Sequence, residues 1–519
     1  HMLSKFITYI IHTVFLFFCK REYEKFIKGD VLKIQQKKLK TLLHKSRNTV
    51  YGRKYGFSNI KDISDFQKNV PVTAYEDYIP YIEEIKKGRQ HVLTSEKVEM
   101  FELTSGSVSA SKLIPYTLSL RKEFQAGIRP WLYSLYKMYP QLKWGKSYWS
   151  ITPLTSLSHW EESAVPIGFE EDSEYFGKFE KYLMELLFVN LHGIQKEKDM
   201  DSFYIKTLCA LLSCRNLRLI SIWSPSFLLL LIEFMESHLE DILKNIKDGK
   251  RREEVKRYVE KKEYGSIWKK LKIISCWGEG NSFFQLQKIK DIFPKAVIQE
   301  KGLLATEAFI SFPLAGETGN CLSYRSHFFE FISLEDGKIY DISQIKAGKE
   351  YEILVTTGGG LYRYSLGDIV EVTSLNKGIP RIKFNGRKGN ISDLHGEKLN
   401  GIFLGKVMEP YLEENRVKYY MFAPDKEKGR YILFLKSDKY ISSLEIDGKM
   451  RKNFHYDYCR KLGQLKSLAI FKLTGNPERE YTEYCQNILG QKLGNIKFRN
   501  LSTESGWENV HTGYFQKEE

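Results

Sequence analysis

Residues 356–372 read TTGGGLYRYSLGDIVEV. The β-branched run EYEILVTT at 350–357 leads into this stretch and predicts a strand, which the glycines at 358–360 then end. The run IVEV at 369–372 predicts a second strand. Asp368 stands between a glycine-containing turn and this second strand, where its carboxylate can accept hydrogen bonds from both hydroxyls of a ribose.

Other short β-like runs lie on both sides of this stretch, from about residue 270 onward. They read KIISCW, AVIQEKG, HFFEFISL and RIKFNG. Helical patterns precede them: residues 31–43 predict an amphipathic helix, and residues 224–235 are apolar nearly all round, with Ser224 as a cap and Pro225 at the first helical position. Long helices followed by strand-rich segments predict a large α/β domain.

The pattern restarts after FNGRKGN at 384–390, with strand-like segments such as YYMFAP and GRYILFLKS. A chain of 519 residues is too long for one ordinary core. We therefore expect an α/β fold with a large domain over residues 1–388 and a smaller α/β domain over residues 389–519.

The positive charge is local. The formal net charge is +16, but residues 1–60 carry thirteen Lys and Arg against three Asp and Glu, and residues 244–272 carry twelve against five. Residues 244–272 mix both signs at helical spacing, which predicts a solvated helix with ion pairs. Since no aromatic interleaving or base-reading motif accompanies either segment, we expect no nucleic-acid partner.

The seven cysteines are scattered and never spaced C-x-x-C, and no Cys and His cluster has zinc-ligand spacing. This usage is typical of a reducing compartment, so we expect a cytoplasmic protein without a structural metal.

The N-terminal segment LSKFITYIIHTVFLFFCKR imitates a signal peptide, but His12 and Thr13 interrupt the apolar run and no small-residue cleavage site follows. The run is also shorter than the roughly 18 to 20 residues of a membrane span. We expect a packed helix without stable membrane insertion; peripheral membrane contact is the alternative.

Residues 101–117, FELTSGSVSASKLIPYT, have the small and hydroxyl residues with which a loop binds phosphate, and Lys112 can offset its charge. Gly106 is the only glycine, and the spacing of a P-loop is absent. Taken alone, the segment reads more often as a serine-rich connector.

Two further segments contain polar groups that nucleotide chemistry needs. GLLATEAFISFPL places Thr306 and Glu307 in an apolar run, where a magnesium ion on phosphate oxygens would give the carboxylate a partner. FNGRKGNISDLHGEKLN adds Arg387 and Lys398 at the expected domain junction.

Together these motifs resemble the auxin-responsive-promoter family of acyl-acid amido synthetases, its bacterial branch in particular, within the luciferase-like acyl-adenylate-forming superfamily. VPVTAYEDYIPYIEEIKKG, SIWSPSFLLLL, KGLLATEAFISFPL, GGLYRYSLGDIVEV and SDLHGEKL carry the resemblance. It implies a large domain that binds ATP and the acyl substrate, with mixed sheets flanked by helices, and a small mobile C-terminal cap domain.

The resemblance also implies a two-step reaction with ATP and Mg²⁺. A small carboxylic acid attacks the α-phosphate of ATP, and an amine, expected to be an amino acid, then attacks the acyl-adenylate to give an amide. An acyl-CoA ligase with a thiol acceptor and a non-catalytic member of the fold stay open as alternatives. The sequence identifies neither the acid nor the amine, nor the oligomeric state.

By similarity, the residues that bind ATP are Thr104, Ser105, Gly106, Ser107, Thr306, Tyr362, Asp368 and Arg387. Glu307 would bind magnesium and Lys398 would meet phosphate. Lys497 in LGNIKF would stabilise the adenylation transition state, with Lys466 as a second candidate for that role.

The chain departs from the family pattern in two places. Val108 replaces a hydroxyl residue of the loop, and Ser109 and Ala110 replace two glycines. Gly401 stands where an acidic residue is expected after Lys398. These changes could slow adenylation, alter the nucleotide preference or mark a loss of activity.

Overall fold

The structure is a computed structural model that describes residues 2–104, 112–150, 163–168, 183, 186–191, 193–194, 197, 199–278, 283–388, 391–489, 491, 496 and 498–517. The chain divides into two compact units. Unit 1 comprises His1–Gly278, Leu286–Leu366 and Val370–Phe384, and unit 2 comprises Glu279–Gln285, Gly367–Ile369 and Asn385–Glu519.

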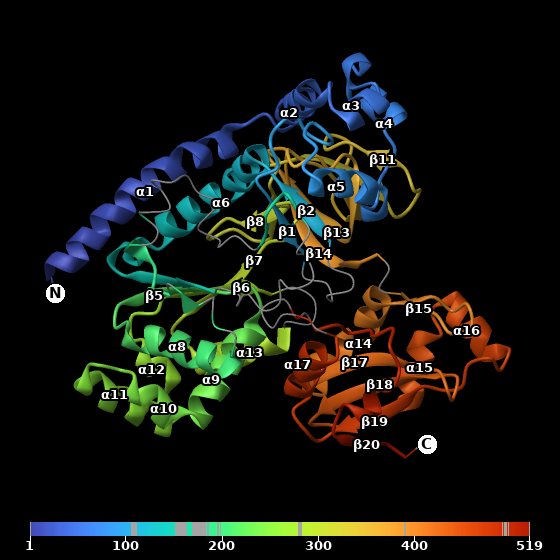
Figure 1. The fold of residues 1–519 in the computed structure, drawn as a ribbon. Helices are drawn as coiled ribbons and strands as arrows, with labels where there is room; N and C mark the ends of the chain where they lie inside the picture. Colours follow the sequence, from blue (N-terminus) through green and yellow to red (C-terminus); the bar gives the residue numbers. More distant parts are fainter. Residues whose placement is uncertain are drawn as a thin grey trace. The chain divides into compact units, whose positions relative to one another are not determined.

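Unit 1 contains most of the helices (Figure 1). In chain order they are α1 (Met2–Lys28), α2 (Val31–Ser46), α3 (Val50–Lys54), α4 (Ile63–Asn69), α5 (Ile79–Lys86), α6 (Leu118–Met138), α8 (Met200–Ser213), α9 (Pro225–Ser237), α10 (Leu239–Lys244), α11 (Gly249–Glu260) and α12 (Tyr264–Ile267), followed by α13 (Phe283–Ile292). Short 3₁₀ helices are η1 (Phe57–Asn59), η2 (Tyr75–Tyr78) and η4 (Pro140–Trp144). Among the described residues, none of these helices combines the length and apolar character that a bilayer span needs.

Two of the sheets lie next to the helices of unit 1. A parallel sheet has the order β3-β5-β6-β7, with β3 (Lys146–Trp149), β5 (Leu217–Ser221), β6 (Ile273–Trp277) and β7 (Val297–Lys301). Figure 1 shows α1 and α6 along one side of this sheet and α8 and α9 on the other. A smaller sheet, β2-β1-β4, contains the hairpin of β1 (Met100–Leu103) and β2 (Leu113–Tyr116), together with β4 (Ile167–Gly168).

A seven-stranded sheet completes the core, in the order β11-β10-β12-β13-β14-β9-β8. Its strands are β8 (Ser311–Pro313), β9 (Asn320–Leu322), β10 (Phe328–Ser333), β11 (Ile339–Tyr340), β12 (Lys349–Thr356), β13 (Tyr364–Asn376) and β14 (Ile379–Arg387). β12 and β13 are the two strands that the sequence predicts on either side of the glycines at 358–360, so this prediction is confirmed.

Unit 2 has its own core around the sheet β17-β18-β19-β20. These strands are β17 (Val417–Asp425), β18 (Arg430–Ser437), β19 (Ala469–Leu473) and β20 (Gly513–Phe515). The helices α14 (Gly401–Glu414), α15 (Ser443–Met450), α16 (Phe454–Lys461) and α17 (Pro477–Asn487) and the two-stranded sheet of β15 (Ile391–Ser392) and β16 (Leu399–Asn400) accompany them.

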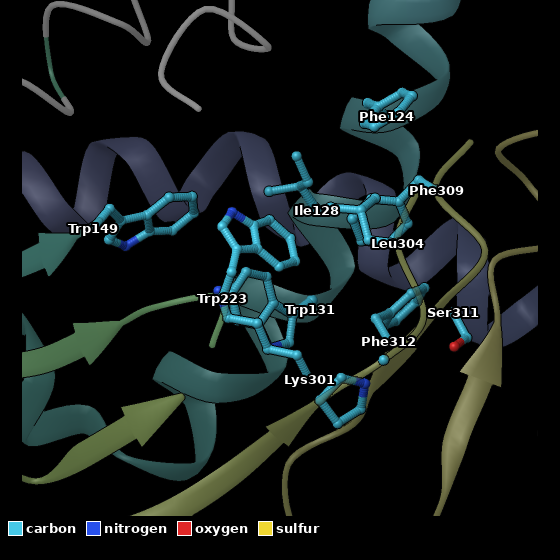
Figure 2. Close-up of a pocket in the computed structure, with 12 residues that line it drawn as sticks. Phe124, Ile128, Trp131, Trp149, Trp223, Lys301, Leu304, Phe309, Ser311 and Phe312 are labelled. Carbon is cyan, nitrogen blue, oxygen red and sulfur yellow. The ribbon is translucent and has the colours of Figure 1, made fainter. Parts of the chain in front are cut away.

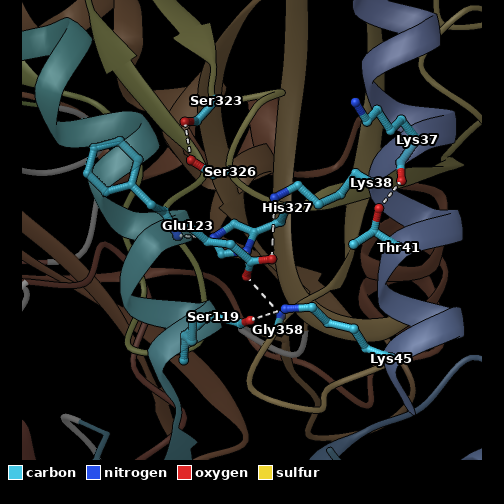
Figure 3. A network of polar contacts seen from close by, with 12 residues as sticks. Lys37, Lys38, Thr41, Lys45, Ser119, Glu123, Ser323, Ser326, His327 and Gly358 are labelled. Atoms are coloured by element: carbon cyan, nitrogen blue, oxygen red, sulfur yellow. Dashed lines mark hydrogen bonds and ion pairs between the residues drawn. The ribbon is translucent and has the colours of Figure 1, made fainter. Parts of the chain in front are cut away.

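A buried carboxylate connects several elements of unit 1 (Figure 3). Oε2 of Glu123 on α6 accepts hydrogen bonds from Nδ1 of His327 at 2.9 Å and from the N–H of Gly358 at 2.8 Å. Its Oε1 lies 3.5 Å from Nζ of Lys38 on α2. Nε2 of His327 accepts the N–H of Phe309 at 2.9 Å, so the ring is neutral with its proton on Nδ1. Glu123 thereby fixes the glycine turn between β12 and β13.

Two local expectations are wrong. α9 begins at Pro225 as predicted, but the Ser224 side chain makes no capping hydrogen bond and pairs with Ser226 instead. α11 is not solvated on all sides: Arg251 is buried and donates hydrogen bonds to the carbonyls of Leu212 and Ile267. The partner of Ser224 is local, whereas the carbonyl partners of Arg251 lie 39 and 16 residues away in sequence, and periodicity alone does not reveal them.

Candidate active site

The β1–β2 hairpin holds the two ends of the serine-rich segment together. The N–H of Thr104 donates to the carbonyl of Lys112 at 3.0 Å, and the N–H of Lys112 donates to Oγ1 of Thr104 at 3.0 Å. The predicted phosphate-binding residues Ser105, Gly106 and Ser107 lie outside the described residues. What the structure does describe is the base of a closed loop, with Lys112 at one end.

The Lys112 side chain extends toward two tyrosines. Its Nζ donates to the hydroxyl of Tyr364 at 3.2 Å and lies 5.4 Å from the ring centre of Tyr75. The Tyr75 hydroxyl in turn accepts the N–H of Leu113 at 2.8 Å. Three segments that are far apart in sequence thus position one ammonium group.

Thr306 and Glu307 occupy a tight turn next to this lysine. Ala305 and Ala308 exchange backbone hydrogen bonds of 3.0 and 3.2 Å, which leaves Thr306 and Glu307 as the two central residues. Oε1 of Glu307 accepts a hydrogen bond from the Tyr364 hydroxyl at 3.4 Å. The structure therefore brings the end of the loop and the Thr-Glu motif together.

We call Tyr75, Thr104, Lys112, Glu307 and Tyr364 the loop-base cluster. Lys112 and Glu307 give it one positive and one negative charge, and both contact the Tyr364 hydroxyl. Burial raises the pKa of the Tyr75 phenol and nearby carboxylates, Glu307 among them, raise it further, so this phenol stays protonated. Such a cluster can pair with phosphate through Lys112 and with a cation through Glu307.

An aromatic pocket lies in the same unit. Figure 2 shows its tryptophans on one side and its phenylalanines on the other. The residues that line it are Phe124, Ile128, Trp131, Trp149, Trp223, Lys301, Gly302, Leu304, Phe309, Ser311, Phe312 and Pro313. Leu304 and Phe309 flank the turn of Thr306 and Glu307, so the pocket and the loop-base cluster share this hairpin.

Two polar groups interrupt the apolar wall of the pocket. Nζ of Lys301 lies 4.2 Å from the ring centre of Trp223 and 5.8 Å from that of Trp131. The indole N–H of Trp149 is buried and has no hydrogen-bond partner among the described residues. An apolar pocket with a few placed donors is typical of a small-molecule site.

Unit 2 contains the predicted ribose carboxylate. Oδ1 of Asp368 lies 3.7 Å from Nε of Arg387, and the carboxylate is largely buried while the guanidinium is exposed. Gly367 has a φ of +72°, which bends β13 just before Asp368. The two residues predicted to meet the ribose therefore lie side by side.

The predicted lysines of unit 2 have different surroundings. Lys398 is exposed and follows the buried Glu397, whose carboxylate accepts the N–H groups of Leu394 at 2.7 Å and His395 at 2.8 Å. Lys466 is exposed next to Leu465, which is buried. Lys497 lies outside the described residues.

Tyr362 is placed in the core. Its hydroxyl donates to the carbonyl of Leu93 at 2.8 Å, and its ring stacks on Tyr51 with the ring centres 5.0 Å apart. The tyrosine that contacts the charged groups is Tyr364, which our sequence analysis missed along with Tyr75. Tyr364 lies in the same RYSLGD motif as Asp368, whereas nothing in the local sequence around Tyr75 indicated its role.

Comparison with known proteins shows the family of the chain. The model of the GH3 family N-terminal domain matches residues 19–298, and that of the GH3 family central domain matches residues 321–387. The chain is 26% identical to the indole-3-acetic acid-amido synthetase GH3.15 of Arabidopsis thaliana over 425 residues, covering 71% of this chain and 70% of that protein. It is 23% identical to GH3.4 of the same plant over 480 residues, covering 81% and 79%.

Solved structures show the same fold. AtGH3.15 acyl acid amido synthetase in complex with 2,4-DB superposes with a TM-score of 0.82 at 19% identity, covering 96% of this chain and 97% of that one. 2-Hydroxyisobutyryl-CoA ligase in the postadenylation state superposes with a TM-score of 0.53 at 12% identity, covering 91% and 89%. The predicted α/β fold is therefore confirmed, and these ligases share it.

Proposed function

Since the chain belongs to the GH3 family, we propose that it is an ATP-dependent ligase that activates a carboxylic acid as an acyl-adenylate and joins it to an amine. The observation that carries this proposal is the loop-base cluster, in which Lys112 and Glu307 meet on one tyrosine hydroxyl. Adenylation needs both signs of charge, because phosphate oxygens require a cation and the metal that neutralises them requires a carboxylate.

ATP would bind with its phosphates at the serine-rich segment. Lys112 would pair with phosphate oxygen, and the described base of the loop keeps the backbone of Thr104 close to it. We assign the phosphate contacts to Ser105, Gly106 and Ser107 and the α-phosphate contact to Thr306.

Glu307 is a suitable ligand for Mg²⁺. Its side chain is mostly buried, and among the described residues it accepts a single long hydrogen bond, at 3.4 Å, from Tyr364. A carboxylate of this kind has lone pairs left for a cation, and Mg²⁺ is commonly held by one or two carboxylates plus substrate phosphates. When bound, the ion would neutralise charge on the phosphate oxygens.

Asp368 would accept hydrogen bonds from the ribose hydroxyls. Arg387 at 3.7 Å offsets the charge of this carboxylate, and a carboxylate is a pure acceptor of hydrogen bonds. We assign Lys398 to a phosphate contact and Lys497 to stabilisation of the adenylation transition state.

The aromatic pocket would bind the acid. Tryptophan and phenylalanine faces favour a flat, aromatic acid, in keeping with the indole-3-acetic acid named for the plant relatives. Lys301 can attract the negative charge of the acid, and the N–H of Trp149 can donate to an acceptor on it. A small polar amine, expected to be an amino acid, is the second substrate.

The reaction consists of two successive nucleophilic displacements. A carboxylate oxygen attacks the α-phosphorus and pyrophosphate leaves; the amine nitrogen next attacks the acyl carbon, AMP leaves with the bond electrons, and the nitrogen loses a proton. Because all seven cysteines are free, we place this reaction in a reducing compartment such as the cytoplasm.

An ATP–pyrophosphate exchange assay tests the first step. Aromatic acids in a panel should support exchange, and addition of amino acids should yield the amide by mass spectrometry. Coenzyme A in place of the amino acid tests a thiol acceptor. If no acid supports exchange and Asp368→Ala changes neither ATP binding nor turnover, the proposal fails.

A further inference from the structure

Helix α1 is apolar on two sides, but the described residues of unit 1 cover only one of them. On the covered side, Phe15, Leu16 and Cys19 are buried, and Nε2 of His12 lies 3.2 Å from the Tyr136 hydroxyl on α6. A helix that is apolar all round is usually enclosed on every side. The packing of the described residues therefore leaves the second apolar side of α1 unexplained.

The uncovered side is a continuous stripe. Its residues are Phe6, Ile7, Ile10, Val14, Phe17 and Phe18, with 53%, 48%, 46%, 40%, 73% and 40% of their surface exposed. Steps of three and four residues place them on one face of the helix. Single exposed apolar side chains are ordinary, but a contiguous apolar patch marks an interaction site.

Basic residues continue the same face. Arg21 and Lys28, four and eleven residues beyond Phe17, are both exposed on this face, and the exposed Glu24 between them pairs with Lys20 at 3.8 Å. The surrounding residues 1–60 carry thirteen Lys and Arg against three Asp and Glu. The stripe thus ends in a positively charged segment at its C-terminal end.

We propose that α1 docks on the surface of a membrane that contains anionic lipids. The stripe from Phe6 to Phe18 inserts at the boundary between headgroups and acyl chains, and Arg21 and Lys28 contact the anionic headgroups. This arrangement is the one that apolar and basic residues on one helix face favour. It requires no membrane span.

Charge favours a lipid surface over a second copy of this chain. An anionic surface attracts the excess of positive charge in residues 1–60, whereas two copies bring that charge together. The heptad-like positions Ile7, Ile10, Val14 and Phe17 extend over only two heptads, while a coiled coil needs about three to four.

The stripe is also separate from the region that defines the family. The match to the GH3 family N-terminal domain begins at residue 19, immediately after Phe18. The inference therefore goes beyond the proposed ligase function and does not depend on it. It concerns where the protein acts, not which reaction it performs.

Vesicle co-sedimentation with the full chain tests the proposal. Vesicles that are roughly a third phosphatidylserine should sediment the protein, vesicles of phosphatidylcholine alone should bind it much more weakly, and about 1 M salt should release it. Phe17→Ser should lower the affinity by about tenfold or more, the worth of burying one aromatic side chain. Arg21→Gln combined with Lys28→Gln should weaken binding to the anionic vesicles selectively.

Phe454→Ser is the matched control. Phe454 on α16 has 74% of its surface exposed, against 73% for Phe17, so both variants remove an equally exposed ring. Phe454→Ser should leave vesicle binding unchanged. Absence of binding to anionic vesicles, or equal loss in both variants, overturns the proposal.

Sedimentation velocity tests whether a second copy of this chain, instead of a lipid surface, covers the stripe. A dimer that Phe17→Ser dissociates, while vesicles bind neither form, would show that a second copy covers the stripe. A monomer that binds anionic vesicles through Phe17 supports the lipid surface.

Discussion

The hydroxyl of Tyr364 accepts a hydrogen bond from Nζ of Lys112 at 3.2 Å and donates one to Oε1 of Glu307 at 3.4 Å. One phenol therefore sets the distance between the cation and the carboxylate of the loop-base cluster. Without the Tyr364 hydroxyl, Lys112 and Glu307 would be positioned less well to neutralise charge in the transition state, and the reaction would slow.

Tyr364→Phe should lower kcat/KM for ATP by about tenfold, which is the size of one hydrogen bond to a charged group. The ring stays, so the thermal midpoint should change little. Tyr340→Phe is the control, because the Tyr340 hydroxyl also donates to a carboxylate, that of Asp336 at 2.8 Å, but on the surface. Equal kinetics in the two variants would exclude a role for the Tyr364 hydroxyl.

Asp368→Asn should weaken the discrimination between ATP and 2′-deoxy-ATP. The wild type should prefer ATP by about tenfold, and the variant by about twofold, because an amide is a poorer partner for two hydroxyl donors. Steady-state kinetics with both nucleotides, in the wild type and in the variant, measures this preference. An equal preference for ATP over 2′-deoxy-ATP in both proteins would show that Asp368 does not contact the 2′-hydroxyl.

Lys301→Met should raise KM for the acid by about tenfold while leaving KM for ATP unchanged, since methionine keeps the length of the side chain and removes its charge. Lys295→Met is the control, because it makes the same chemical change on the exposed surface and should leave KM for the acid unchanged. If the acid KM stays constant, the charge of Lys301 has no part in acid recognition.

Glu123→Gln should lower the free energy of unfolding by about 3 kcal/mol, because Glu123 is a buried ion-pair partner with several hydrogen bonds. Glu99→Gln should change it by less than about 0.5 kcal/mol, since the ion pair of Glu99 with Arg121 is partly exposed. Urea titrations of both variants measure the difference, and similar values would contradict the structural role of Glu123.

Acid should destabilise unit 1 through the same pair. Burial lowers the pKa of His327 despite the Glu123 carboxylate. Burial raises the pKa of Glu123, but the charge of Lys38 and the hydrogen bonds from His327 and Gly358 outweigh it and lower that pKa. Both folded-state pKa values lie below their unfolded values, so the unfolded chain binds more protons. Stability should therefore fall first as the pH drops below about 6.5 and again below about 4.3.

Urea midpoints at pH 7.5 and 5.5 check the first step of this pH dependence. The buried His12, whose pKa burial lowers to about 4, acts in the same direction. In a His12→Gln variant, the urea midpoint should still fall between pH 7.5 and 5.5, by the amount that His327 contributes. A midpoint that stays constant between the two pH values would contradict both assignments.

Helices and strands of this fold could be predicted from the sequence where the spacing of apolar residues is regular. EYEILVTT and IVEV became β12 and β13, and residues 31–43 became the amphipathic part of α2, since alternation and helical spacing of apolar residues report which face is buried. Arg251 could not be read in the same way. Its carbonyl partners, Leu212 and Ile267, are distant in sequence.

The candidate site shows the same division. Thr306 and Glu307 stand out in the sequence because a polar group in an apolar run needs a partner, and Asp368 stands out by its place between a glycine-containing turn and a strand. The sequence does not show that Tyr364 contacts Lys112, because that contact depends on three-dimensional packing. The position of Tyr75 likewise depends on a distant contact, because its hydroxyl accepts the N–H of Leu113, 38 residues away in sequence.

Lys398 has a φ of +46°, a left-handed conformation that a side chain with a β-carbon adopts at a cost of roughly 1–2 kcal/mol. Glycine would occupy this position without that strain. Lys398→Gly should therefore melt at a higher temperature, and it should lose adenylation if the ammonium group has the phosphate contact that we propose. Directed evolution for stability would therefore be expected to replace Lys398 early.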